Sequence, residues 1–112
     1  MADIPVQQLK QTTLANVPDD KAFWVCRGDR VRNLSDLANC IESLSADQFK
    51  YHVDDVKKTT HFSKWIADVL KNPLLARDVN LEPNLHDQKH LVKTIRDHLN
   101  WLQHTHQQWV HA

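Results

Sequence analysis

Residues 62–70 read Phe-Ser-Lys-Trp-Ile-Ala-Asp-Val-Leu, and this stretch decides the fold class. Its apolar residues recur at intervals of three and four, which places them on one face of an α-helix. The members of that face are Phe62, Trp65, Ile66, Val69 and Leu70. Because such a face must be buried, the spacing predicts a helix that packs against other elements of a core.

The helical period continues on both sides of this stretch. Upstream, residues 34–44 carry apolar residues at helical spacing, and Ser45 and Gln48 form a capping-box pattern that predicts a second, shorter helix. Downstream, Asn72 and Pro73 predict the end of one helix and the start of the next. The side chains expected in the core are Phe23, Trp24, Val25, Leu37, Ile41, Phe62, Trp65, Ile66, Val69 and Leu99.

One segment favours β-structure. Residues 22–26 are aromatic and β-branched, and the single glycine, Gly28, follows where a tight turn needs a positive φ. A two-stranded hairpin is therefore predicted within residues 21–33. Further upstream, Asp3 and Pro5 form a pattern typical of the start of a short helix.

We predict one mainly α domain that spans residues 1–112. It is a small helical domain with one short N-terminal β-hairpin and a long C-terminal helix. Its parts are an N-terminal segment (1–20), the hairpin (21–33), a helical core (34–80) and the long C-terminal helix (84–111). A chain of this length can bury a core without metal or disulfide staples, so Cys26 and Cys40 are expected to be reduced thiols.

Composition argues against several classes of function. A single glycine rules out the glycine-rich phosphate loops and nucleophile elbows of many enzymes. The 14 Lys and Arg residues balance 14 Asp and Glu residues, which argues against nucleic acid as a partner. No secretion signal is visible and no apolar run approaches about 20 residues, so we expect a cytoplasmic protein without a membrane partner.

Part of the chain resembles a small helical domain-of-unknown-function family of bacteria and archaea. The resemblance covers roughly residues 22 to 79 and is most specific in the Trp-Ile helix. The residues that carry it are the Tyr51-His52 pair, the Phe62-x-x-Trp65-Ile66 helix and the trailing Leu75-Ala76. This chain has His61 where the family pattern has Asp, so Thr60 or Thr59 is expected to cap the helix. The resemblance implies a helical fold and carries no activity with it.

The predicted C-terminal helix carries an apolar seam. Leu99, Leu102, His106 and Trp109 continue a pattern of alternating three- and four-residue steps, which is typical of helices that pack side by side. A straight helix of about 27 residues is about 40 Å long, so it should overhang a domain of this size. Trp101, on the polar side of the helix, adds an aromatic group suited to an interface.

We therefore favour a non-catalytic protein-interaction domain that forms a homodimer or binds a protein partner through this seam. The complex is expected to weaken below about pH 6, when His106 takes up a proton.

A histidine-rich face of the same helix supports an alternative function. His86 and His90 stand four residues apart, a spacing that lets two imidazoles share one metal ion on a helix. His104 lies on the same face. The alternative is a module that binds Zn²⁺ or another divalent metal, and no other cofactor is expected.

A second alternative is a small ligand-binding domain or enzyme built around Tyr51, His52 and His61. Two histidines and a tyrosine supply groups that accept and donate protons, provided that the fold brings them together around a pocket.

Overall fold

The computed structural model describes residues 3–26 and 28–111, and helices make up most of them. The helices are α1 (Val6–Thr13), α2 (Leu34–Ser43), α3 (Ala46–Tyr51), α4 (His61–Asp68), α5 (Pro73–Val79) and α6 (Gln88–His104). The strands are β1 (Asp3–Pro5), β2 (Phe23–Trp24), β3 (Arg30–Val31), β4 (Val53–Asp54), β5 (Thr59–Thr60) and β6 (Trp109–His111), with a 3-10 turn at Asp19–Lys21 before β2. The mainly α fold class is thus confirmed. None of the described helices is long and apolar enough to cross a lipid bilayer.

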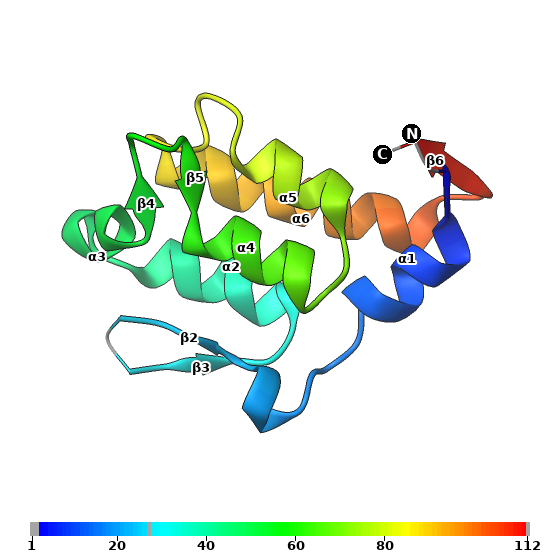
Figure 1. Cartoon of the computed structure of the whole chain (residues 1–112), viewed down its shortest axis with the longest axis horizontal. Coiled ribbons are helices and arrows are strands. Elements are labelled where there is room, and N and C mark those ends of the chain that lie inside the picture. Colours follow the sequence, from blue (N-terminus) through cyan, green and yellow to red (C-terminus); the bar gives the residue numbers. More distant parts are fainter. Residues whose placement is uncertain (1–2, 27, 112) are drawn as a thin grey trace.

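The helices pack in pairs. Helix α2 lies against α6, α4 lies against α5, and α5 also contacts α6. The antiparallel β2–β3 hairpin runs along one side of this helical body, and β1 and β6 pair with each other at the far end (Figure 1). The predicted hairpin is therefore present, and Gly28 has the positive φ, +102°, that its turn was expected to need.

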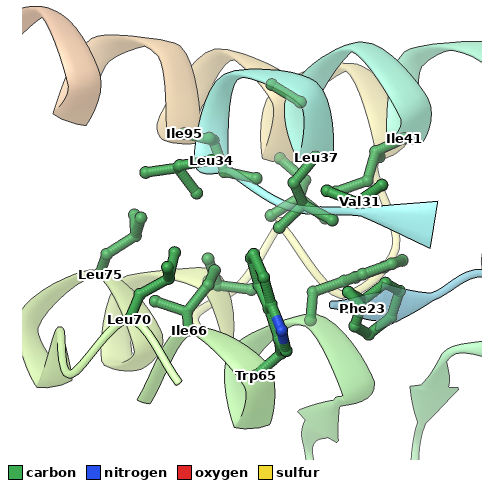
Figure 2. Close-up of a cluster of buried hydrophobic side chains, with 14 of the residues drawn as sticks. Phe23, Val31, Leu34, Leu37, Ile41, Trp65, Ile66, Leu70, Leu75 and Ile95 are labelled. Carbon is green, nitrogen blue, oxygen red and sulfur yellow. The ribbon is translucent and has the colours of Figure 1, made fainter. Parts of the chain in front are cut away.

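The main core lies between these elements (Figure 2). Most of the predicted core side chains are buried there, namely Phe23, Val25, Leu37, Ile41, Phe62, Trp65 and Ile66. Val69 and Leu99 are half-buried at the edge of the same core. The helical periodicity therefore located the buried faces correctly.

Trp24 does not belong to the core, and the expectation for it is wrong. Its side chain is 62% exposed, whereas Phe23 and Val25 on either side are buried. Side chains alternate between the two faces of a strand, so the inward positions of Phe23 and Val25 turn Trp24 outward. The Arg30 guanidinium lies 5.4 Å from the centroid of the Trp24 ring, across the hairpin.

Local capping determines where the central helices begin. The Ser45 side chain accepts a hydrogen bond from the Gln48 N–H, and the Gln48 side chain accepts one from the Ser45 N–H. Thr60 Oγ1 accepts a hydrogen bond from the Ser63 N–H at 2.9 Å, so Thr60 caps α4 as expected. Asn72 caps α5 in the same manner. These caps satisfy backbone donors that the first helical turn leaves free.

The C-terminal helix is shorter at both ends than the predicted range 84–111. It starts at Gln88, because Asp87 Oδ1 accepts a hydrogen bond from the His90 N–H and so caps the first turn. It ends at His104, and residues 109–111 instead form β6. A 17-residue helix is about 26 Å long, less than the 39 Å long axis of the molecule. The expected overhang is therefore absent.

The pairing of the chain ends explains this correction. In the antiparallel β1–β6 pair, Ile4 lies opposite Val110, which is buried. Val110 gains burial as a strand residue, whereas Thr105 and His106 are weak helix formers that do little to prolong α6. The same pairing makes Asp3–Pro5 a strand, so the helix predicted to start there begins at Val6 instead.

The predicted N-terminal hairpin is one of three antiparallel strand pairs in the described residues, and the other two were not predicted. Besides β1–β6, the polar stretch after α3 forms the β4–β5 hairpin. Asp54 Oδ1 accepts hydrogen bonds from the N–H groups of Val56 and Lys57, each at 3.0 Å, and Lys58 has a φ of 55°. The turn is thus built by an aspartate side chain rather than by glycine or proline.

Candidate functional site

Leu102, in the middle of the apolar seam predicted along the C-terminal helix, is covered by the chain itself. Leu102 is fully buried in a second apolar cluster, which it forms with Val6 and Leu9 of α1 and Val110 of β6. Trp101 packs half-buried against that cluster. Leu102 is therefore not available to a partner.

The remaining residues of the seam differ in burial and in location. Leu99 is half-buried against the main core, whereas His106 and Trp109 are exposed beyond the end of α6. The structure thus does not bring the predicted interaction residues onto one helix face, because the helix stops before the last two of them.

The predicted metal residues are also dispersed. His86 precedes α6, so it does not share a helix face with His90. The His86 ring lies between two carboxylates, with Nδ1 3.0 Å from Glu82 Oε2 and Nε2 2.7 Å from Asp55 Oδ1. Hydrogen bonds to Glu82 and then Asp55 raise the pKa of His86 above its usual value. The ring therefore favours a proton, which competes with any metal ion.

The other two histidines are engaged elsewhere. His90 Nδ1 lies 2.6 Å from Asn84 Oδ1, and His104 Nδ1 lies 2.8 Å from the Asn100 carbonyl oxygen. Across residues 3–26 and 28–111, no group of three or more His, Cys, Asp or Glu side chains is arranged to hold a metal ion.

Tyr51, His52 and His61 do come together, as the second alternative required. The Tyr51 ring centroid is 5.1 Å from that of His52 and 6.0 Å from that of His61, both edge-on. The two imidazoles are 5.2 Å apart, and their Nδ1 atoms are 3.0 Å apart, within hydrogen-bond distance. His52 is buried, whereas Tyr51 and His61 are exposed.

Hydrogen bonds determine the protonation of this histidine pair, His52 and His61. The Cys26 N–H donates to His52 Nε2 at 3.2 Å, so Nε2 carries no proton. A neutral imidazole then carries its proton on Nδ1, and His52 donates it to His61 Nδ1. Both hydrogen bonds therefore have the same direction. The hairpin residue Cys26 donates to His52, and His52 donates to His61 at the start of α4.

Burial keeps His52 neutral. Its side chain lies against Phe23 and Phe62, with ring centroids 5.5 and 5.0 Å away. Loss of hydration, and secondly the neighbouring His61, lower the pKa of His52 to about 4. The ring therefore acts near neutral pH as a hydrogen-bonding bridge without charge.

The two segments that carry the pair are held close to each other. His52 ends α3 and His61 begins α4, on either side of the β4–β5 hairpin. The His61 N–H also donates to the His52 carbonyl oxygen at 2.9 Å. The spacing of nine residues in the sequence gave no signal of this contact, because the hairpin that closes it was not predicted.

Cys26 contacts His52 through its backbone N–H, and Trp24 lies on the same hairpin. They are exposed on the outward side of the hairpin, two residues apart. The Cys26 Sγ is 3.8 Å from the Gln48 carbonyl oxygen, and it is the Cys26 backbone N–H that binds His52. The arrangement therefore lacks the thiol–imidazole hydrogen bond of a cysteine nucleophile. Strand alternation was the signal that could have identified the outward position of Trp24.

Two grooves lie on either side of Gln88, away from the histidine pair. One, of about 620 Å³, runs between α2 and α6, and the other, of about 260 Å³, lies between α3 and the segment before α6. Neither is lined by Tyr51, His52 or His61. The histidine pair therefore lies outside both grooves.

The lowered pKa of His52 predicts acid sensitivity. The pKa is about 4 in the folded chain and about 6.5 in an unfolded one, so the unfolded state binds more protons between these values. The free energy of unfolding should therefore fall by about 2 to 3 kcal/mol from pH 6.5 to pH 4 through His52 alone. Urea denaturation of the wild type and of His52→Asn at each pH measures this share, and equal slopes for both would contradict it.

His98 should also lower the free energy of unfolding in acid, and it serves as the comparison for His52. Burial lowers its pKa, although Asp78 opposes this effect, and its Nε2 lies 2.9 Å from Asn72 Nδ2. A His98→Asn variant should retain the share of the slope that belongs to His52.

Comparison of the chain with protein-family models, with curated proteins and with solved structures gives no match. The resemblance to a helical family of unknown function therefore stays a prediction.

Proposed function

We propose that this chain is a non-catalytic protein-interaction domain that associates with a second copy of itself. The surface that we assign to this contact is the Trp24–Tyr51 surface, which comprises Trp24, Cys26, Tyr51 and His61, all exposed. The observation that carries the proposal is the exposure of two large aromatic side chains, 62% for Trp24 and 66% for Tyr51. Tryptophan and tyrosine supply much of the binding energy at protein interfaces.

Both aromatic side chains stand on a rigid base. Phe23, next to Trp24, packs against Phe62 and Trp65 with ring centroids 5.5 and 5.9 Å away. Tyr51 contacts both rings of the histidine pair, and the bond from Cys26 to His52 ties the two segments together. Because the backbone that carries these side chains is held in place, less conformational entropy is lost when they are covered.

The charge balance supports a second copy as the partner. Positive and negative side chains are equal in number, so two copies meet without long-range repulsion. A homodimer also places each aromatic anchor opposite a surface of the same chemistry. A reducing compartment such as the cytoplasm suits this contact, because Cys26 is an exposed free thiol.

Sedimentation velocity from about 10 to about 300 µM at neutral pH tests the proposal. The mean sedimentation coefficient should rise with concentration for the wild type. The double variant Trp24→Ala, Tyr51→Ala should weaken association by at least about 2 kcal/mol, or about thirtyfold, and remain monomeric.

Trp109→Ala is the matched control, because Trp109 is 55% exposed at the opposite end of the molecule. This variant should associate like the wild type. A constant monomer mass for the wild type would overturn self-association, and an equal loss with Trp109→Ala would place the contact elsewhere.

A further inference from the structure

A pocket of about 350 Å³ lies where α5, α6 and β6 meet. Its volume falls within the range of sites for small molecules, about 300 to 1,000 Å³. The apolar side chains that line it include Leu74, Trp101 and Val110, and the polar ones include Arg77, Asp78 and His98. Apolar walls with a few polar groups are typical of a site that binds a small ligand.

A buried polar network fixes the orientation of the His98 ring at this pocket. Asn72 is fully buried, and its Oδ1 accepts a hydrogen bond from the Leu75 N–H at 3.0 Å. The Asn72 Nδ2 group therefore donates, to Thr13 Oγ1 at 3.1 Å and to His98 Nε2 at 2.9 Å. His98 Nε2 thus carries no proton, and the neutral ring carries its proton on Nδ1.

The same contacts keep His98 without charge. A second proton on its ring would set an Nε2–H donor against the Nδ2–H donor of Asn72, with no acceptor between them. Burial also lowers the pKa of His98, although the carboxylate of Asp78 opposes this effect. Near neutral pH the ring therefore offers the pocket one hydrogen-bond donor, the Nδ1–H.

The pocket adds an acceptor near this donor. Within residues 3–26 and 28–111, the bond to Asn72 is the one hydrogen bond that the His98 side chain forms, so its Nδ1–H remains for a ligand. The carboxylate of Asp78 lies near enough to His98 to act on its charge. Asp78 Oδ1 is engaged only by the Arg77 guanidinium, at 3.4 Å, which leaves the carboxylate able to accept a further hydrogen bond.

We propose that this pocket binds a small, neutral, planar ring that carries a carbonyl group next to an N–H, as uracil and other cyclic amides do. The carbonyl oxygen accepts from His98 Nδ1–H, and the ring N–H donates to the Asp78 carboxylate. Trp101, whose ring centroid is 5.5 Å from that of His98, supplies an aromatic wall for the bound ring. This site goes beyond the proposed function and does not depend on self-association.

The charges at the pocket favour a neutral ligand. The Arg77 guanidinium and the Asp78 carboxylate pair with each other, and His98 is neutral. His111, which also lines the pocket, pairs with Asp3. An organic anion would face the Asp78 carboxylate, and an amine would face the Arg77 guanidinium and the His98 donor, so either charge meets repulsion.

Titration with uracil, followed by NMR at about pH 7.5, tests the proposal, because the His98 ring is neutral at this pH. Uracil should shift the ring resonances of His98 and Trp101 in a saturable manner, with a dissociation constant of about 1 mM or below. Uracil that is methylated on both ring nitrogens keeps the ring and its carbonyl groups but has no N–H. It should bind at least about tenfold more weakly.

Two variants assign the contacts. His98→Phe keeps an aromatic ring but removes the Nδ1–H, and it should weaken uracil binding at least about tenfold. Asp78→Ala leaves the buried network intact and should bring uracil and its methylated form to the same affinity. His104→Phe is the matched control, because His104 is exposed on the same helix and outside the pocket. Its dissociation constant should equal that of the wild type.

Two results would overturn the inference. One is the absence of a saturable shift at His98 and Trp101 up to about 20 mM uracil. The other is equal binding of uracil and its methylated form by the wild type, which would mean that Asp78 accepts no hydrogen bond from the ligand. Neither result bears on self-association, because the Trp24–Tyr51 surface shares no residue with this pocket.

Discussion

Replacing Trp65 with alanine should destabilise the fold by about 3 to 5 kcal/mol, a large part of the stability of a domain of this size. Trp65 is 7% exposed on α4 and packs edge-on against Phe23, with ring centroids 5.9 Å apart. Its Nε1–H donates to the Lys21 carbonyl oxygen at 2.8 Å. The variant therefore leaves a cavity and also deprives the segment before the hairpin of a hydrogen bond.

Urea denaturation followed by circular dichroism measures this loss. Trp24→Ala is the matched control, because Trp24 has the same side chain but is 62% exposed, and its cost should stay below about 1 kcal/mol. Trp65→Phe separates the two contributions, because it keeps most of the apolar volume and loses the hydrogen bond, at about 1 kcal/mol. A loss below 1 kcal/mol for Trp65→Ala would mean that α4 does not form the centre of the core.

The second large effect is expected from Leu102→Asp. Leu102 is fully buried between α1, α6 and β6, with Val6, Leu9 and Val110. A carboxylate at this position would be buried without a partner, so we expect a loss of at least about 4 kcal/mol and separation of the β1–β6 pair from the helices.

Hydrogen exchange of backbone amides at the chain ends reports this separation directly. The Val6 N–H, which donates to the Gln108 carbonyl oxygen at 2.9 Å, should lose its protection in Leu102→Asp. Trp109→Ala, on the exposed side of β6, should retain that protection and cost less than about 1 kcal/mol. If Leu102→Asp is a folded monomer whose backbone amides stay fully protected from hydrogen exchange, Leu102 must face solvent.

Local signals predicted the helices well. The capping residues and the spacing of apolar side chains both involve only a few neighbouring residues. The Ser45–Gln48 capping box, the Thr60 cap and the Asn72-Pro73 boundary all lie where the pattern indicated. The apolar spacing around Trp65 likewise identified the buried face of α4. Each of these features depends on side chains and backbone groups that lie within two turns of an α-helix of one another.

The candidate site could be predicted only in part. Tyr51, His52 and His61 were recognised as residues with suitable chemistry, but the direction of their hydrogen bonds depends on the Cys26 N–H, which lies 26 residues away from His52. The outward position of Trp24 followed from strand alternation, a local signal that was outweighed by the usual burial of tryptophan.

The amino-acid sequence by itself thus determined the helical class, the capped starts of the central helices and the position of the β2–β3 hairpin. The tertiary structure alone decided the end of α6, the β1–β6 pair and the burial of Leu102, because each depends on contacts between the two ends of the chain. An apolar seam predicts only that this face of the helix is covered by something. Whether a second chain or the protein's own α1 and β6 cover Leu102 depends on how the termini pack, and no local pattern contains that information.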